Sequence, residues 1–303
     1  MNQFAIAGIQ MPVHYGHDNI PAMADQLHVL MLRFPWVEMV VFSELAAFGP
    51  SLAHAQTLPG PAEVRFQEMA RRHRIWLIPG SIFERVGDRI YNTSSVIDPE
   101  GRVVKRYRKM FPFRPYEAGV SSGTEFCVFD VPDVGRFGLS ICYDMWFPET
   151  TRTLASMGAV VLLHPSLTNT VDRDVELSIA RATAAINQCY VIDVNGVGSG
   201  GYGRSIVVRP TGTVVYEAGN GAEMFPFHFN VEAATHGRSE GLFGLGQQLK
   251  SFRDRAVDFS VYRPNHASTE YLDSLGPLAV PRRGTIPGPG SLHEGPGRST
   301  EEA

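Results

Sequence analysis

The chain has 303 residues, of which 44% are hydrophobic and 19% charged, so it can bury a sizeable core and is not a disordered protein. A formal net charge of −4, without a long basic stretch, argues against nucleic acid or an anionic membrane surface as a partner. Three cysteines are a sparse, odd set, which argues against a disulfide framework and fits a reducing compartment.

The first residues, Met1 to Ala7, lack the cationic segment and apolar run of a signal peptide. No stretch approaches the roughly 18 apolar residues of a membrane span, so we expect a cytoplasmic protein. Short apolar runs then alternate with segments of helical period. They predict strands at Phe4–Ile9, Met39–Phe42, Trp76–Ile78 and Thr93–Ile97, and helices at Ile20–Phe34 and Pro61–His73.

Two charged residues in this half stand beside strand-like runs. Glu44 ends the run Val-Val-Phe-Ser-Glu44, and Lys109 lies in Lys-Arg-Tyr-Arg-Lys109-Met-Phe-Pro-Phe-Arg-Pro-Tyr-Glu117. Taken singly, Glu44 could be a solvated strand end and Lys109 a surface charge.

Cys142 stands between a predicted strand at Phe137–Ile141 and a predicted helix at Pro148–Met157. The segment therefore predicts a sharp turn that carries a thiol. Such a turn places a side chain and the following backbone N–H at a strand end, where a nucleophile and an oxyanion donor can act together. Cys127 and Cys189 are interpreted as small core residues.

The rest of the chain continues the mixed pattern. Strands are predicted at Val160–Leu163, Tyr190–Val194, Ile206–Val208 and Val214–Tyr216, a helix at Val171–Gln188, and turns at Pro99–Gly101 and Pro210–Gly212. Several strands do not alternate, which indicates cover on both faces. We expect one α/β domain with mixed sheets over residues 1–262. The Pro/Gly-rich tail, 263–303, is expected to be disordered or to form an oligomer arm.

Two further motifs do not predict a cofactor site. Gly196-Val-Gly198-Ser-Gly-Gly201 matches a dinucleotide pattern, but a strand and not a helix is predicted after it. His14 and His17 lack a third ligand in a convincing pattern, so we expect no metal. We expect no cofactor of any kind.

Glu44, Lys109 and Cys142 suit one chemistry if the fold brings them together. A thiol is a strong nucleophile only as its thiolate, so it needs a base or a cation nearby. Glu44 can take the proton, and Lys109 can hold a tetrahedral oxyanion. Glu117 can position the substrate, Lys109 or water.

The order Glu44, Lys109, Cys142 resembles the nitrilase or carbon–nitrogen hydrolase superfamily over about residues 4 to 262. The resemblance implies a four-layer α-β-β-α sandwich with two mixed sheets face to face. It assigns the general base to Glu44, the catalytic lysine to Lys109, the nucleophile to Cys142 and the second glutamate of the amidase branches to Glu117. The chain departs from many relatives at Ala185-Ile186-Asn187, where they often carry Glu before Asn.

The motifs around these residues point to the amidase branches. Lys109-x-x-Pro112-Phe113-x-Pro115-x-Glu117 looks like the aliphatic amidase and formamidase branch, and Cys142-x-Asp144-x-Trp146-Phe147-Pro148-Glu149 like the carbamoylputrescine amidase branch. True nitrilases usually show Cys-Trp-Glu at the nucleophile, where this chain has Cys142-Tyr143-Asp144. The residues expected to bind substrate or the oxyanion are Tyr143, Trp146, Phe113, Tyr116 and His164.

We therefore expect a homo-oligomeric thiol hydrolase that converts a small neutral carboxamide to a carboxylic acid and ammonia through a cysteine thioester. The aromatic residues could equally be ordinary core, and His164 a buried structural histidine. The alternatives are an N-carbamoyl-amine hydrolase, a nitrilase, or an inactive binding protein on the same fold.

Overall fold

The computed structural model describes residues 3–262 and 269–279. The chain divides into two compact units, one made of Met1–Pro112 and Gly119–Asp258, the other of Phe113–Ala118 and the chain from Phe259 onward. The second unit contains a helix, α7 (Thr269–Ser274). The rest of the predicted tail, 263–268 and 280–303, lies outside the described residues, and the expected domain boundary at residue 262 stays a prediction.

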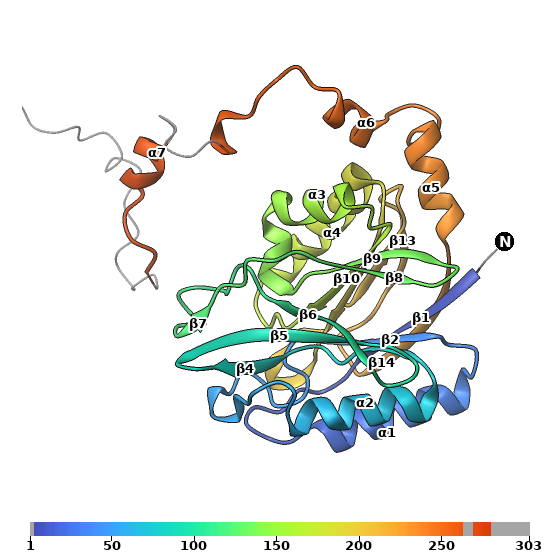
Figure 1. Cartoon of the computed structure of the whole chain (residues 1–303), viewed down its shortest axis with the longest axis vertical. Coiled ribbons are helices and arrows are strands. Elements are labelled where there is room, and N and C mark those ends of the chain that lie inside the picture. The colour runs from blue at the N-terminus through green and yellow to red at the C-terminus, as the bar shows by residue number, and fades with distance from the viewer. Residues whose placement is uncertain (1–2, 263–268, 280–303) are drawn as a thin grey trace, which may run out of the picture. The chain divides into compact units, whose positions relative to one another are not determined.

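The first unit is built from both strands and helices (Figure 1). Its helices of at least six residues are α1 (Ile20–Arg33), α2 (Pro61–His73), α3 (Pro148–Ser156), α4 (Arg173–Asn187), α5 (Val231–Glu240) and α6 (Gln248–Arg253). Its strands are β1 (Gln3–Gln10), β2 (Met39–Phe42), β3 (Trp76–Ile78), β4 (Ile82–Val86), β5 (Arg89–Ile97), β6 (Val103–Arg108), β7 (Val120–Ser121), β8 (Cys127–Val131), β9 (Gly135–Leu139), β10 (Val161–Ser166), β11 (Tyr190–Asn195), β12 (Ile206–Val208), β13 (Val214–Glu217) and β14 (Glu223–Asn230).

The strands form two mixed sheets, as predicted. One has eight strands, with the order β14-β1-β2-β3-β5-β4, and with β6 and β7 paired to β5. The other has six, in the order β13-β12-β11-β10-β9-β8. The central pairs β1·β2, β2·β3, β9·β10 and β10·β11 are parallel, whereas the flanking pairs β1·β14 and β11·β12 are antiparallel.

Three apolar clusters separate four layers, so the predicted α-β-β-α sandwich is confirmed (Figure 1). The central cluster joins the inner faces of the two sheets, with Phe4 and Ile6 on one side and Phe137 and Ile192 on the other. A second cluster buries α1 and α2 against the eight-stranded sheet, and a third buries α3 and α4 against the six-stranded sheet. Strands β2, β10, β11 and β12 are buried at every residue, which explains the unbroken apolar runs of β2 and β12 and the apolar residues that begin β10 and β11.

Several elements were absent from the sequence prediction. Strand β6 reads Val-Val-Lys-Arg-Tyr-Arg, and its exposed charges hide the strand pattern. Strand β14 contains Pro226 and His228, and its side chains are only partly buried. Backbone pairing with β5 holds β6 in its sheet. Strand β14 pairs with β1 and also places Phe225, Phe227 and Phe229, at every second residue, against the central apolar cluster.

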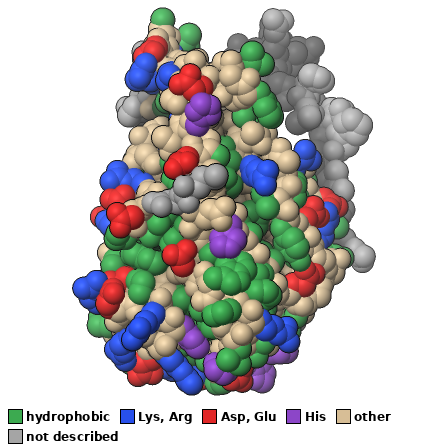
Figure 2. Space-filling model, turned by 90° about the vertical axis from the view of Figure 1, so that its right-hand side faces the viewer, with side chains coloured by type: hydrophobic (Ala, Val, Ile, Leu, Met, Phe, Trp, Pro, Cys, Tyr) green, Lys and Arg blue, Asp and Glu red, His purple; other side chains and the backbone are tan. Residues whose placement is uncertain are grey.

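The surface mixes charges of both signs. On the face shown in Figure 2, acidic and basic side chains are interspersed with apolar ones. In the part of the chain that the structure describes, no helix combines the length and hydropathy needed to cross a bilayer.

Candidate active site

Cys142 occupies the predicted sharp turn. Strand β9 ends at Leu139, a 3₁₀ turn covers Cys142–Trp146, and α3 begins at Pro148. Cys142 itself has a φ of 47°, in the left-handed region that residues with a side chain seldom adopt. Backbone strain of this kind is concentrated at functional sites, because the surrounding structure must hold it in place.

Asp144 anchors this turn to the segment that carries Lys109. Its Oδ2 accepts hydrogen bonds from the Tyr107 hydroxyl at 2.6 Å and from the Ile141 N–H at 2.9 Å, and its Oδ1 accepts one from the Phe111 N–H at 2.9 Å. Burial raises the pKa of Asp144 to about 6, although these hydrogen bonds oppose the rise. Asp144 therefore ties the turn that carries Cys142 to both ends of the Lys109 segment, a role that the sequence analysis missed.

We predict that Asp144→Ala destabilises the protein substantially. The substitution leaves two backbone N–H groups and the Tyr107 hydroxyl without this acceptor, and a buried unsatisfied donor costs about 1–3 kcal/mol. We expect a total loss of roughly 3 kcal/mol or more in the free energy of unfolding, measured by urea denaturation. Tyr107→Phe is the control, since it removes one of the three donors and should cost about 1 kcal/mol. Equal losses in the two variants would contradict the anchoring role.

Glu44 and Lys109, which are 65 positions apart in the sequence, form a buried ion pair. Lys109 Nζ lies 2.8 Å from Glu44 Oε1, and the two side chains are only 1% and 4% exposed. Asn92 Nδ2 donates to the same carboxylate oxygen at 2.7 Å, and the Asn92 carbonyl accepts from the Lys109 N–H at 2.8 Å. A buried pair of this geometry holds both charges in place, because removing either partner leaves the other uncompensated.

The two sheets meet at this point. Glu44 follows β2, and its backbone N–H donates to the carbonyl of Ser166, the last residue of β10, at 3.1 Å. Cys142 follows β9, the parallel neighbour of β10. The candidate site is therefore at the carboxyl ends of parallel strands, where ligands bind in open α/β sheets.

The charges of Glu44 and Lys109 act directly on the thiol. Burial is the largest cause of a Cys142 pKa well above its usual range, the Glu44 carboxylate raises it further, and the Lys109 ammonium lowers it. Cys127 and Cys189 are fully buried, and burial raises each of their pKa values to about 12. Of the three cysteines, Cys142 is the one whose pKa is affected by both a carboxylate and an ammonium group.

Of the residues expected to bind substrate, His164, Tyr143 and Trp146 lie in the first compact unit. His164 is buried in β10, where its Nδ1 lies 2.7 Å from Ser140 Oγ, and burial lowers its pKa to about 4. It is therefore neutral at neutral pH. Tyr143 follows Cys142 in the 3₁₀ turn, and its ring meets that of Phe147 edge-on at 5.2 Å. Trp146, in the same turn, is half-buried, and its Nε1 lies 3.4 Å from Glu176 Oε1.

Glu117, Phe113 and Tyr116 belong to the second compact unit, which is described by itself. Within it, the Glu117 carboxylate accepts a hydrogen bond from the Phe113 N–H, and the rings of Phe113 and Tyr116 stack at 5.1 Å. A role for these three residues at the catalytic centre stays a prediction.

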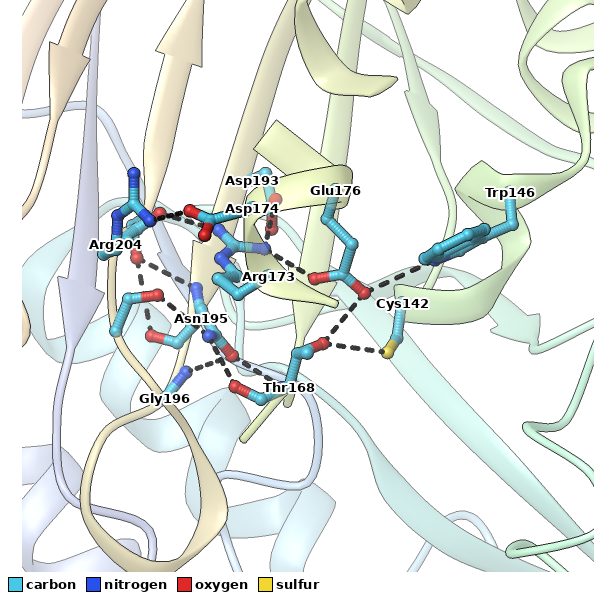
Figure 3. Close-up of polar contacts among 12 residues, drawn as sticks. Cys142, Trp146, Thr168, Arg173, Asp174, Glu176, Asp193, Asn195, Gly196 and Arg204 are labelled. Carbon is cyan, nitrogen blue, oxygen red and sulfur yellow. Dashed lines mark hydrogen bonds and ion pairs between the residues drawn. The ribbon is translucent and has the colours of Figure 1, made fainter. Parts of the chain in front are cut away.

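A buried polar network beside Cys142 was missed by the sequence analysis (Figure 3). Arg173 Nη1 contacts Glu176 Oε2 at 3.0 Å and Asp193 Oδ2 at 2.8 Å, and all three side chains are buried. Thr168 Oγ1 donates to Glu176 Oε1 at 3.0 Å and lies 3.9 Å from the Cys142 sulfur. One signal was visible in the sequence: Asp193 interrupts an otherwise apolar strand, and a buried carboxylate requires a partner.

Comparison with known proteins gives a consistent result. The model of the carbon–nitrogen hydrolase family matches residues 6–225, more than half of the chain. The crystal structure of Saccharomyces cerevisiae Nit3, described as a member of branch 10 of the nitrilase superfamily, is similar with a TM-score of 0.72 and 29% sequence identity, covering 78% of this chain and 93% of that one.

Curated relatives carry amidase names. Omega-amidase NIT2 of Pongo abelii is 33% identical over 181 residues, which is 55% of this chain and 65% of that protein. The 2-oxoglutaramate amidase of Bacillus subtilis (strain 168) is 32% identical over 192 residues, which is 60% of this chain and 74% of that protein. The match thus spans less than two thirds of the first relative's length.

Proposed function

The chain belongs to the carbon–nitrogen hydrolase family, and from that premise we propose that it hydrolyses the carbon–nitrogen bond of a small carboxamide, releasing a carboxylic acid and ammonia. The observation that carries the proposal is the buried Glu44–Lys109 pair, whose charges act on a thiol in a strained turn at the strand ends. The amidase names of the relatives support the same reaction.

In the proposed mechanism, Glu44 takes the proton of the Cys142 thiol, and the sulfur attacks the amide carbonyl carbon. The Lys109 ammonium and the Tyr143 N–H stabilise the tetrahedral oxyanion. When this intermediate collapses, the C–N bond breaks, the nitrogen receives the proton held by Glu44, and ammonia leaves. Glu44 then removes a proton from water, and the resulting oxygen nucleophile attacks the thioester carbonyl carbon. The C–S bond breaks, the carboxylic acid leaves, and the proton held by Glu44 returns to the Cys142 sulfur, which regenerates both groups.

A panel of simple amides, ureides and nitriles tests the reaction class by ammonia release. We expect release from the amides. Carbon dioxide released together with ammonia would instead identify an N-carbamoyl-amine hydrolase. Preferential turnover of nitriles would identify a nitrilase, and no release from any member of the panel would favour a binding protein on this fold.

We propose that the acyl group of the substrate is neutral. Trp146 lies in the same 3₁₀ turn as Cys142, where it presents an aromatic ring and not a cation. The buried Arg173 already contacts two carboxylates, so Arg173 is not free to pair with a carboxylate of the substrate. The names of the relatives point the other way, because 2-oxoglutaramate bears a carboxylate. The acyl group therefore needs its own test.

We predict that butyramide is hydrolysed with a higher kcat/KM than succinamate, which has the same chain length but ends in a carboxylate. An unpaired carboxylate that costs about 3 kcal/mol lowers kcat/KM by roughly a hundredfold. Steady-state ammonia release from both substrates measures the ratio. Equal or better use of succinamate would show that a cation lines the acyl pocket, as an enzyme acting on carboxylate-bearing amides requires.

We also propose a cytoplasmic homo-oligomer. Large apolar side chains stand exposed on the first unit, among them Val171, Phe243 and Leu245, which are 87%, 75% and 80% exposed. Phe243 and Leu245 stand two positions apart in the segment after α5, and neighbouring exposed apolar groups are typical of subunit contacts. Light scattering coupled to size-exclusion chromatography measures the mass, and a mass near 33.4 kDa at all concentrations would contradict the oligomer.

A further inference from the structure

The Glu176 carboxylate is linked to Cys142 through the hydroxyl group of Thr168 (Figure 3). The Thr168 hydroxyl donates to Glu176 Oε1 at 3.0 Å, and the same hydroxyl oxygen is 3.9 Å from the Cys142 sulfur. Trp146 Nε1 also points at this carboxylate oxygen, at 3.4 Å. The proposed mechanism uses neither Glu176 nor Thr168, although their chain of contacts ends on the nucleophile.

The surroundings of Glu176 match its charged form. Arg173 contacts the other carboxylate oxygen at 3.0 Å, so the side chains that contact the Glu176 carboxylate, Arg173, Thr168 and Trp146, all act as hydrogen-bond donors. Arg173 is shared with Asp193, so one buried guanidinium group contacts two buried carboxyl groups. Burial raises the pKa of Glu176, and Arg173 and the Thr168 hydroxyl oppose that rise.

The direction of the Thr168 hydroxyl proton decides whether the Cys142 sulfur faces a hydrogen-bond donor or an acceptor. A hydroxyl group has one proton and two lone pairs. Because this proton is donated to Glu176, the lone pairs of the Thr168 oxygen are left for Cys142. They can accept from a thiol S–H, but they repel a thiolate.

We propose that Glu176, acting through Thr168, is a positioning residue that keeps Cys142 as a protonated thiol in the resting enzyme, so that thiolate forms only when Glu44 removes the proton for attack. The inference rests on the proposed function. It adds a control on the nucleophile: a resting thiol is protected from unwanted oxidation and alkylation, since these reactions require the thiolate.

The groups around Cys142 affect its pKa in opposite directions. Glu44 and Glu176 both raise the thiol pKa, whereas the Lys109 ammonium and a backbone hydrogen bond from Leu167 lower it. His164, in contact with the Cys142 backbone, is neutral because burial lowers its pKa to about 4. Asp144 in the same turn is held by Tyr107 and two backbone N–H groups. Glu176 is therefore the one carboxylate in this set whose link to the sulfur runs through a rotatable hydroxyl.

Glu176→Gln tests the proposal. The Gln side chain keeps an oxygen for Thr168 and Trp146 but carries no charge, so the Thr168 proton is free to turn toward a thiolate. We expect the pH profile of Cys142 alkylation by iodoacetamide, followed by intact mass, to move to lower pH by about one unit, which is about a tenfold faster reaction below the midpoint. Cys142→Ala identifies the alkylated residue.

Thr168 variants test whether the effect passes through the hydroxyl. Thr168→Ser keeps the hydroxyl and should keep the wild-type profile, whereas Thr168→Val should move the profile to lower pH. Adding Glu176→Gln to Thr168→Val should give a smaller shift than Glu176→Gln alone. Thr150→Val is the matched control, because the buried Thr150 hydroxyl has no hydrogen-bond partner among the described residues and should leave the profile unchanged.

An unchanged or upward-shifted profile in Glu176→Gln would overturn the proposal, and equal shifts with and without the Thr168 hydroxyl would show that Glu176 does not act through it. If Glu176→Gln does not fold, the Ser and Val variants of Thr168 decide on their own: identical profiles overturn the proposal. Alkylation needs no amide, so failure of the proposed function is seen separately, as an absence of ammonia release from the amide panel.

Discussion

Cys142→Ala is expected to fold normally and to lose essentially all ammonia release from simple amides. The substitution removes only the sulfur atom of a partly buried residue and keeps its Cβ, so little packing is lost. The proposed thioester cannot form without the sulfur. Steady-state ammonia release measures the loss, and circular dichroism and the urea midpoint show that the fold is retained.

Cys127→Ala and Cys189→Ala are the matched controls. Both thiols lie in apolar clusters, and burial raises the pKa of each to about 12, so neither provides a thiolate. We expect both variants to keep near wild-type turnover, with a packing cost of about 1 kcal/mol in stability. More than a few per cent of wild-type ammonia release in Cys142→Ala would rule out the proposed nucleophile.

The fold was largely predictable from the sequence because its core strands are covered on both faces. Strands such as β2 and β12 read as short unbroken apolar runs, which are typical of strands buried between two layers. Strand β6 was missed because most of its side chains are charged or exposed. Strand β14 was missed because Pro226 and His228 interrupt its pattern, although Phe225, Phe227 and Phe229 alternate toward the central apolar cluster.

The spatial relation of Glu44 to Lys109 could be expected from the sequence only through family resemblance, because no local pattern links residues 65 positions apart. Their 2.8 Å contact depends on the pairing of β2 with β3 and of β5 with β6, which are non-local features. The Thr168–Glu176 link was missed for the same reason. Glu176 reads as a solvated residue on a helix, and only the packing of α4 against the six-stranded sheet buries it beside Asp193.

Glu44→Gln is expected to stop both halves of the proposed cycle. The carboxylate oxygen of Glu44 accepts from Lys109 and from Asn92, and a Gln oxygen can accept from the same donors without a large change of shape. A neutral amide, however, can neither take the thiol proton nor activate water. We expect kcat to fall by at least about a hundredfold, which is the lower end of what a positioned general base contributes.

Whether Glu44→Gln forms an acyl-enzyme is more informative than its loss of rate, because it shows which step is blocked. Intact-mass measurement with substrate present should show no acyl-enzyme, because acylation is blocked before deacylation begins. Glu63→Gln is the control: Glu63 is a buried carboxylate that pairs with Arg106 at 2.7 Å, away from the thiol, so it should lose stability but keep turnover. If Glu44→Gln instead accumulated a normal acyl-enzyme burst, Glu44 would act only in hydrolysis of the thioester, and the base that deprotonates Cys142 would have to be a different group.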